Sequence, residues 1–256
     1  LAGIADEFSS MVEGRASKVP RSSVEIRSLK TIHGAPNTDG DEEEQKRLKK
    51  QIEKCIGLVN DVLEGRYTDP ARFADGILLQ KQDFQPGLKR RDRSSAAMEN
   101  SRHDIFISPM ARKHQRRITV SGSNTAKLTA LCRSLSNDWA TQNTASGILS
   151  EQQHLFELSA NDIKPNQTIE SAIKHQLFSD LDEVDEALIR QMLKDMPDAI
   201  TILLDGFNGK NCGENIMDVL SGRTLQEVTV MVTTRPRSAN MLHRMAPGVY
   251  DRIEMY

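Results

Sequence analysis

The stretch ITILLDGF, residues 200–207, decides the fold class of this 256-residue chain. Its first five residues form a nearly continuous apolar run just after Pro197. The run is too short for a helix and is typical of a strand buried on both faces, the kind found in parallel sheets covered by helices. Asp205 follows at the carboxyl end of this strand, which is the edge where open α/β sheets bind ligands.

Strand and helix patterns alternate on both sides of this segment. Besides 200–204, short apolar runs predict strands at 118–120, 154–158, 228–233 and 252–255. Apolar residues at three- and four-residue steps predict helices at 125–142, 168–178, 182–196, 216–220 and 239–244. This alternation predicts an α/β fold, with a five-stranded, mainly parallel sheet and helices on both faces. Strands 118–120 and 200–204 should both lie inside the sheet.

The N-terminal part of the chain has a different organisation. Residues 1–40 are polar and interrupted by proline and glycine, which predicts a flexible arm or linker. Residues 41–104 should form a helical region and hinge, loosely attached to the remainder, with an amphipathic helix at 41–63 that stops before Gly65. Asp69 and Pro70 then form a good start for a second, short helix. The α/β domain is expected to cover residues 105–256.

Composition limits the classes of partner. The chain has 34 basic and 36 acidic residues, so its net charge of -2 provides no general attraction to nucleic acid or to a membrane surface. Its three cysteines have no C-x-x-C spacing, which favours a reducing, cytoplasmic setting. No apolar run approaches the roughly 18 residues that a membrane span needs. Because the sequence begins at Leu1 without an initiator methionine, we expect a fragment of a longer protein.

The segment from Ile118 to Gly122 runs directly into a predicted helix. A strand, a glycine and a helix N-terminus in this order are the context of a phosphate-binding loop, because backbone N–H groups and the helix terminus both attract anions. Asp205 ends another strand where a magnesium ion on a bound triphosphate would lie. A third strand, 228–233, ends in the polar and basic sequence TTRP at the same edge.

These segments together resemble the NACHT family of NOD-like receptors. That family has strands ending in L-D-G-x-D-E and in T-S-R-P, similar to residues 204–209 and 233–236 here, and a D-W-A at the end of the P-loop helix, as at 138–140. The resemblance implies a sheet of the P-loop NTPase type. The resemblance covers roughly residues 105–255. It implies a cytoplasmic switch ATPase in which bound ATP or ADP, with Mg²⁺, controls the association of an innate-immune or cell-death receptor with other protein chains.

The resemblance also implies a set of site residues. Asp205 and Thr129 would bind the metal. The nucleotide would contact the junction and the first helical turn together with the end of the third strand, at Gly122, Ser123, Asn124, Thr125, Ala126, Lys127, Thr129, Thr234 and Arg235.

The sequence departs from the family pattern G-x-x-G-x-G-K-T/S in its phosphate loop. If the family pattern is aligned without a gap, Lys127 stands at its last glycine and Leu128 at its lysine. If one residue is deleted, Lys127 stands at the lysine instead, and Thr129 lies one step beyond the position of the hydroxyl residue. Asn208 and Gly209 replace the acidic pair that follows Asp205, so no catalytic residue is assigned. We therefore expect weak or absent hydrolysis. The alternative is a pseudo-ATPase scaffold that binds protein chains and no nucleotide.

Overall fold

The structure is a computed structural model that describes residues 39–73, 87–90, 99–100, 116–141, 154–209 and 213–256. Its strands form one seven-stranded sheet in the order β2-β1-β7-β3-β6-β5-β4. The strands are β1 (Leu88–Arg90), β2 (Glu99–Asn100), β3 (Arg117–Gly122), β4 (His154–Ser159), β5 (Ile200–Phe207), β6 (Thr229–Thr234) and β7 (Tyr250–Met255).

The five strands from β7 to β4 pair in parallel throughout. This confirms the predicted fold class and the five predicted parallel strands, and both β3 and β5 lie inside the sheet as expected. The antiparallel strands β1 and β2, which extend the sheet at β7, were not predicted. β1 lies in a basic cluster, a sequence typical of a solvated loop. Its structure is therefore determined by backbone pairing with β7 and not by an apolar pattern.

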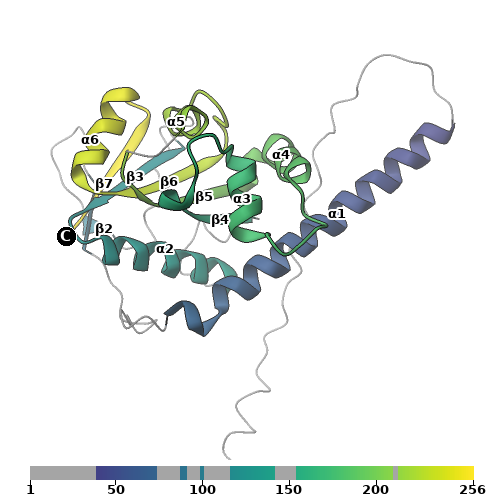
Figure 1. Cartoon of the computed structure of the whole chain (residues 1–256), viewed down its shortest axis with the longest axis horizontal. Coiled ribbons are helices and arrows are strands. Elements are labelled where there is room, and N and C mark those ends of the chain that lie inside the picture. Colours follow the sequence, from purple (N-terminus) through teal and green to yellow (C-terminus); the bar gives the residue numbers. More distant parts are fainter. Residues whose placement is uncertain (1–38, 74–86, 91–98, 101–115, 142–153, 210–212) are drawn as a thin grey trace, which may run out of the picture. The chain divides into compact units, whose positions relative to one another are not determined.

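Helices cover both faces of this sheet (Figure 1). They are α2 (Thr125–Ala140), α3 (Ile169–Leu177), α4 (Glu186–Asp195), α5 (Glu214–Ser221) and α6 (Pro236–Met245), with single 3-10 turns at η4 (Ala160–Asp162) and η5 (Pro197–Ala199). The crossover through α2 runs from β3 towards β4, and the later crossovers run back in the opposite direction. Because such crossovers are right-handed, α2 lies on one face and α3 to α6 lie on the other.

This topology defines a switch point between β3 and β6. The two strands are neighbours, but the helices that follow them, α2 and α6, lie on opposite faces of the sheet. A crevice at the carboxyl ends of two such strands is where open α/β sheets bind ligands. The junction at 122–125 and the junction at 234–236 both lie at this point.

The N-terminal helix α1 (Asp39–Thr68) is longer than predicted and is followed by the 3-10 turn η1 (Pro70–Phe73). It continues through Gly65, although an interior glycine costs about 1 kcal/mol of helix stability. Tyr67 explains the difference, because its side chain is fully buried and its ring packs edge-on against Trp139 at 6.0 Å between centroids. Tertiary burial of the last turn therefore outweighs the local stop signal.

The expectation of a loosely attached helical region is wrong for the second half of α1. Val59, Leu63 and Tyr67 are all fully buried in the same core as the sheet. Residues 1–38 of the predicted arm and most of the predicted hinge lie outside the described residues. In the part of the chain that the structure describes, no helix has the length and apolar character needed to cross a membrane.

Candidate functional site

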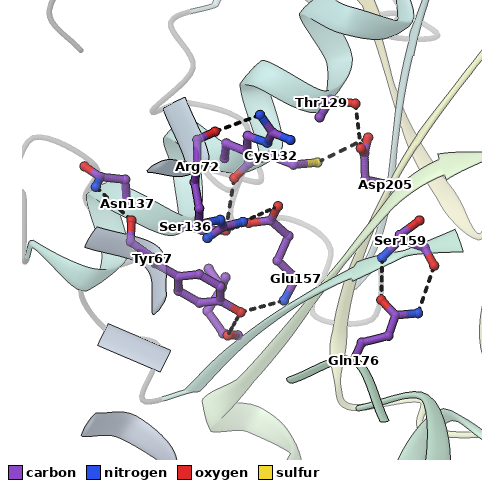
Figure 2. Close-up of polar contacts among 12 residues, drawn as sticks. Tyr67, Arg72, Thr129, Cys132, Ser136, Asn137, Glu157, Ser159, Gln176 and Asp205 are labelled. Atoms are coloured by element: carbon purple, nitrogen blue, oxygen red, sulfur yellow. Dashed lines mark hydrogen bonds and ion pairs between the residues drawn. The ribbon is translucent and has the colours of Figure 1, made fainter. Parts of the chain in front are cut away.

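Asp205 is the centre of a polar cluster at the carboxyl edge of the sheet (Figure 2). One carboxylate oxygen accepts a hydrogen bond from the Thr129 hydroxyl at 2.6 Å. The other accepts one from the Thr233 hydroxyl, and the Cys132 sulfur lies 3.9 Å from the same oxygen. Thr129 and Cys132 come from α2, and Thr233 comes from β6. The structure therefore brings together the two residues that the sequence assigned to a metal, Asp205 and Thr129.

Thr233 was not among the predicted site residues. It is fully buried, and its hydroxyl donates to Asp205 and accepts from the backbone N–H of Gly206 at 2.9 Å. The signal was present in the sequence, because a polar residue that directly follows the apolar run VMV in a buried strand needs a buried hydrogen-bond partner. Its neighbour Thr234 was predicted instead. Thr234 donates to the carbonyl of Phe207, where the pairing of β5 with β6 shifts register.

The junction between β3 and α2 is a short, capped turn. Only Ser123 and Asn124 separate the strand from the helix, which begins at Thr125. The Asn124 side chain accepts a hydrogen bond from the backbone N–H of Lys127 at 3.2 Å, as helix N-cap residues do. A phosphate group at this terminus would need that N–H, so the asparagine occupies a position that a nucleotide would have to take.

The remaining predicted residues of the junction surround this cap without contacting Asp205. Ser123, Asn124, Thr125 and Lys127 are exposed, and Ala126 is half-buried. Gly122 packs against β7, because a β-carbon added there would lie 3.2 Å from the carbonyl oxygen of Met255. Arg235 is exposed immediately before α6. Among the described residues, no hydrogen bond or ion pair joins Lys127 or Arg235 to Asp205.

The first turn of α2 distinguishes between the two placements of the family pattern on this sequence. Leu128 is buried at 2% exposure, and Thr129, seven positions after Gly122, bonds to Asp205. This arrangement matches ungapped placement, in which Thr129 stands at the family's hydroxyl position and Leu128 stands at its lysine. In this placement Lys127, which is exposed in the first turn of α2, does not correspond to the phosphate-binding lysine of the family.

The residues present fit a magnesium ion better than they fit a phosphate chain. A carboxylate and a hydroxyl are oxygen ligands of the kind that Mg²⁺ takes, usually with one or two carboxylates and several waters. Within the described ranges, no group of three or more His, Cys, Asp or Glu side chains could hold a metal by itself. The two-residue junction, its asparagine cap and the buried Leu128 do not form a glycine-rich phosphate cradle.

Cys132 is not a candidate nucleophile. Burial raises the pKa of its thiol well above the ordinary value, and the nearby carboxylates of Asp205 and Glu157 raise this pKa further. The thiol is fully buried and stays protonated near neutral pH. Asn208, at a position where the family has an acidic residue, uses its amide to donate to the Asn161 side chain at 2.7 Å. Asn208 therefore does not supply a carboxylate that could position an attacking water.

A second polar cluster, which the sequence did not reveal, lies beside the first on α2 and β4 (Figure 2). Glu157 forms an ion pair with Arg72 of η1 at 2.8 Å and accepts a hydrogen bond from Ser136. The Arg72 guanidinium also lies over the ring of Tyr67, 4.9 Å from its centroid. Burial, and then the charge of Glu157, raise the pKa of Tyr67 above its usual range, so its hydroxyl stays neutral. This cluster attaches the N-terminal segment to the α/β domain.

Comparison with known proteins does not identify a family for the chain. A scan against models of protein families finds no match, and a search of curated proteins finds none. The resemblance to NACHT proteins therefore remains a hypothesis that depends on the motifs and on the geometry of the Asp205 cluster.

Replacing Asn124 with alanine should lower the free energy of unfolding by about 1 kcal/mol, the usual value of a side-chain N-cap. The measurement is urea denaturation monitored by the fluorescence of Trp139, the only tryptophan. Ser123→Ala is the matched control, because Ser123 is exposed in the same junction and does not cap the helix. Equal unfolding midpoints for the two variants would show that the Asn124 cap is not formed.

Proposed function

We propose that residues 105–256 form a regulatory nucleotide-binding module of a cytoplasmic innate-immune or cell-death receptor, which binds ATP or ADP with Mg²⁺ weakly and has little or no hydrolytic activity. The observation that supports this most directly is the 2.6 Å hydrogen bond between Thr129 and Asp205. It joins the first turns of the helix after β3 to the end of β5, beside the switch point. That is the geometry in which a carboxylate and a hydroxyl can share one divalent cation.

Each side of the switch point would contribute to binding. Asp205 and Thr129 would hold the metal, which neutralises phosphate charge when bound. The N-terminus of α2 offers backbone N–H groups and the positive end of a helix dipole to an anion. Arg235, on the β6 side, adds an exposed cation. Lys127 adds a second one in the first turn of α2.

Two features argue that binding is weak. The hydrogen bond from the N–H of Lys127 to the Asn124 side chain must break before this N–H can donate to a phosphate. The buried Leu128 stands where the family has its phosphate-binding lysine, so the strongest single cation of a P-loop is missing. The same two features favour the second candidate function, a pseudo-ATPase scaffold that associates with other protein chains and takes no nucleotide.

Titration with a fluorescent ATP analogue, with and without Mg²⁺, separates the two candidates. We expect weak binding that is stronger with Mg²⁺. Asp205→Asn should remove most of the Mg²⁺ dependence, since Asp205 is the carboxylate that the proposal assigns to the metal. Lys127→Ala should weaken binding about fivefold, because a cation about 4 Å from a phosphate in water contributes about 1 kcal/mol.

The matched controls are Asp218→Asn and Lys194→Ala, which change the same residue types on α5 and α4. Both should bind the analogue as the unchanged chain does. Binding that is undetectable at millimolar nucleotide would reject the nucleotide-binding module in favour of the scaffold.

A further inference from the structure

We infer that residues 67–73, here called the connector, position α2 on the sheet and thereby control how firmly Thr129 meets Asp205. The connector comprises the end of α1, Asp69 and η1. The consequence for metal binding rests on the function proposed above, whereas the positioning of α2 does not depend on any ligand. The inference follows from the way in which two carboxylates and the connector hold one helix.

Two hydroxyls on one face of α2 bond to carboxylates of the sheet (Figure 2). Thr129 donates to Asp205 of β5 at 2.6 Å, and the fully buried Ser136 donates to Glu157 of β4. Asp205 pairs with Ser159, two residues beyond Glu157, so both carboxylates leave the same face of the sheet. The two hydroxyls lie about two helical turns apart. The sheet therefore holds α2 at two points, and one of them is the proposed metal site.

The charges of the two carboxylates are balanced differently. Glu157 forms an ion pair with Arg72 of the connector at 2.8 Å, and the side chains are 11% and 20% exposed respectively. Asp205 accepts hydrogen bonds from two hydroxyls, and no cation of the described residues pairs with it. A buried charge is costly without a partner. The connector thus supplies the cation that makes the contact of α2 with Glu157 favourable.

The connector also accepts two hydrogen bonds directly from α2. The Asn137 side chain donates to the carbonyl of Tyr67 at 3.0 Å, and the Arg133 guanidinium donates to the carbonyl of Arg72 at 2.8 Å. The last carbonyls of a helix have no partner within it, so Asn137 satisfies one that α1 leaves unpaired. The end of α1 and the second half of α2 are therefore held together by side chains of both helices.

Displacement of the connector would consequently loosen α2 at the point where Glu157 holds it. With 16 residues, α2 is a rigid element about 24 Å long, so a change at Ser136 moves Thr129 as well. Energetic coupling between two sites is reciprocal. A cation that draws Thr129 towards Asp205 should therefore also tighten the contact between α2 and the connector.

Peptide-resolved hydrogen exchange of the Arg72→Met variant, without ligand, tests the positioning. Methionine fills the volume of the arginine stem and removes the ion pair, but it keeps the carbonyl to which Arg133 donates. The amides at 128–132, around Thr129, should exchange about fivefold faster or more, the lower end of the usual range for coupled sites. Peptides from β6 should exchange at the same rate as in the unchanged chain. A purely local role of Arg72 would confine the increase to residues 133–140.

Three further variants complete this comparison. Ser136→Ala removes the bond from α2 to Glu157 and should accelerate exchange in the same amides, which keeps the test informative if Arg72→Met folds poorly. Arg72→Lys keeps the charge and should restore much of the protection. Arg190→Met is the matched control, because Arg190 pairs with Glu170 at 3.6 Å on the opposite face of the sheet. It should leave exchange in α2 unchanged.

The fluorescent ATP analogue measures the consequence for the metal site. Arg72→Met should weaken binding about fivefold or more with Mg²⁺ and leave binding without Mg²⁺ unchanged, because the connector acts on the two residues assigned to the metal. In the unchanged chain, the analogue with Mg²⁺ should slow exchange in the last turn of α1. If the unchanged chain binds no analogue, the proposed function is rejected, and the exchange of the ligand-free chain alone decides the inference.

Three results would overturn the inference. The first is unaltered exchange around Thr129 in both Arg72→Met and Ser136→Ala. The second is an equal acceleration in the β6 peptides, which would make general destabilisation the cause. The third applies where the analogue binds, and is an equal loss of affinity with and without Mg²⁺ in Arg72→Met.

Discussion

Replacing Arg117 with methionine should lower the free energy of unfolding by about 3 kcal/mol or more. Arg117 begins β3, is 2% exposed, and in the described part of the chain its guanidinium does not bond to a carboxylate. Its guanidinium instead donates to a set of carbonyl oxygens, those of Val219 at 3.0 Å, Thr224 at 3.1 Å, Leu225 at 2.7 Å and Val228 at 2.5 Å.

The physical reason is that these carbonyls lose their donor together. A buried polar group without a partner costs about 1 to 3 kcal/mol, and methionine fills the volume of the arginine stem without donating to any of them. Burial lowers the pKa of Arg117 to about 10, which still leaves it charged near neutral pH. The five-donor guanidinium is the side chain that can satisfy several carbonyls at once.

Arg116→Met is the matched control for this prediction. Arg116 is the preceding residue, but its ion pair with Asp198 involves a carboxylate that is 72% exposed. An ion pair of that kind contributes about 1 kcal/mol or less. Urea denaturation of both variants gives the comparison. If the two unfold at the same urea concentration, the carbonyl cluster around Arg117 does not stabilise the fold as argued.

ATP turnover by the purified chain should stay near the uncatalysed background, about 10⁴-fold below that of an intact site. Phosphoryl transfer depends on positioning and on charge stabilisation, and the loss of one preorganised group costs about a hundredfold in rate. In the proposed site, two such groups of the family pattern are replaced, the lysine by Leu128 and an acidic residue by Asn208. Phosphate release at high protein concentration is the measurement.

Asp205→Asn supplies the internal control for turnover. Because the site is expected to have no activity to lose, this variant and the unchanged chain should release phosphate at the same rate. Robust turnover that Asp205→Asn abolishes would show that the departures from the family pattern do not disable the site.

The fold was predictable because its central strands are buried on both faces. Runs such as residues 200–204 and 228–233 are apolar almost without interruption, and the helices between them repeat apolar residues at helical spacing. β1 and β2 escaped prediction because their sequences, at 88–90 and 99–100, carry no such pattern. Their structure comes from the pairing of β1 with β7 and of β2 with β1. The predicted helix ended before Gly65, because the burial of Tyr67 that offsets the cost of this glycine is a tertiary effect.

The candidate site was predictable only in part. Asp205 could be found because it ends an apolar strand, and Thr129 could be found from its distance in sequence to Gly122. The structure places the Thr129 hydroxyl of α2 in contact with the Asp205 carboxylate of β5. The Asn124 cap could not be foreseen as a competitor for phosphate, since it depends on where the helix begins. Glu157 and Arg72, 85 positions apart, meet through a tertiary contact that no local pattern encodes.

The burial of Cys132 also makes the candidate site open to a chemical measurement of its dynamics. Its thiol lies between α2 and β5, beside Asp205 and one helical turn from Thr129, and alkylating reagents attack the thiolate rather than the thiol. The reaction therefore requires α2 to separate from the sheet. The ratio of the alkylation rate in the folded chain to that in the unfolded chain gives the free energy of this opening. Peptide-resolved mass spectrometry, which distinguishes Cys132 from Cys55 and Cys212, thus measures how firmly the Thr129–Asp205 contact is held without any ligand being added.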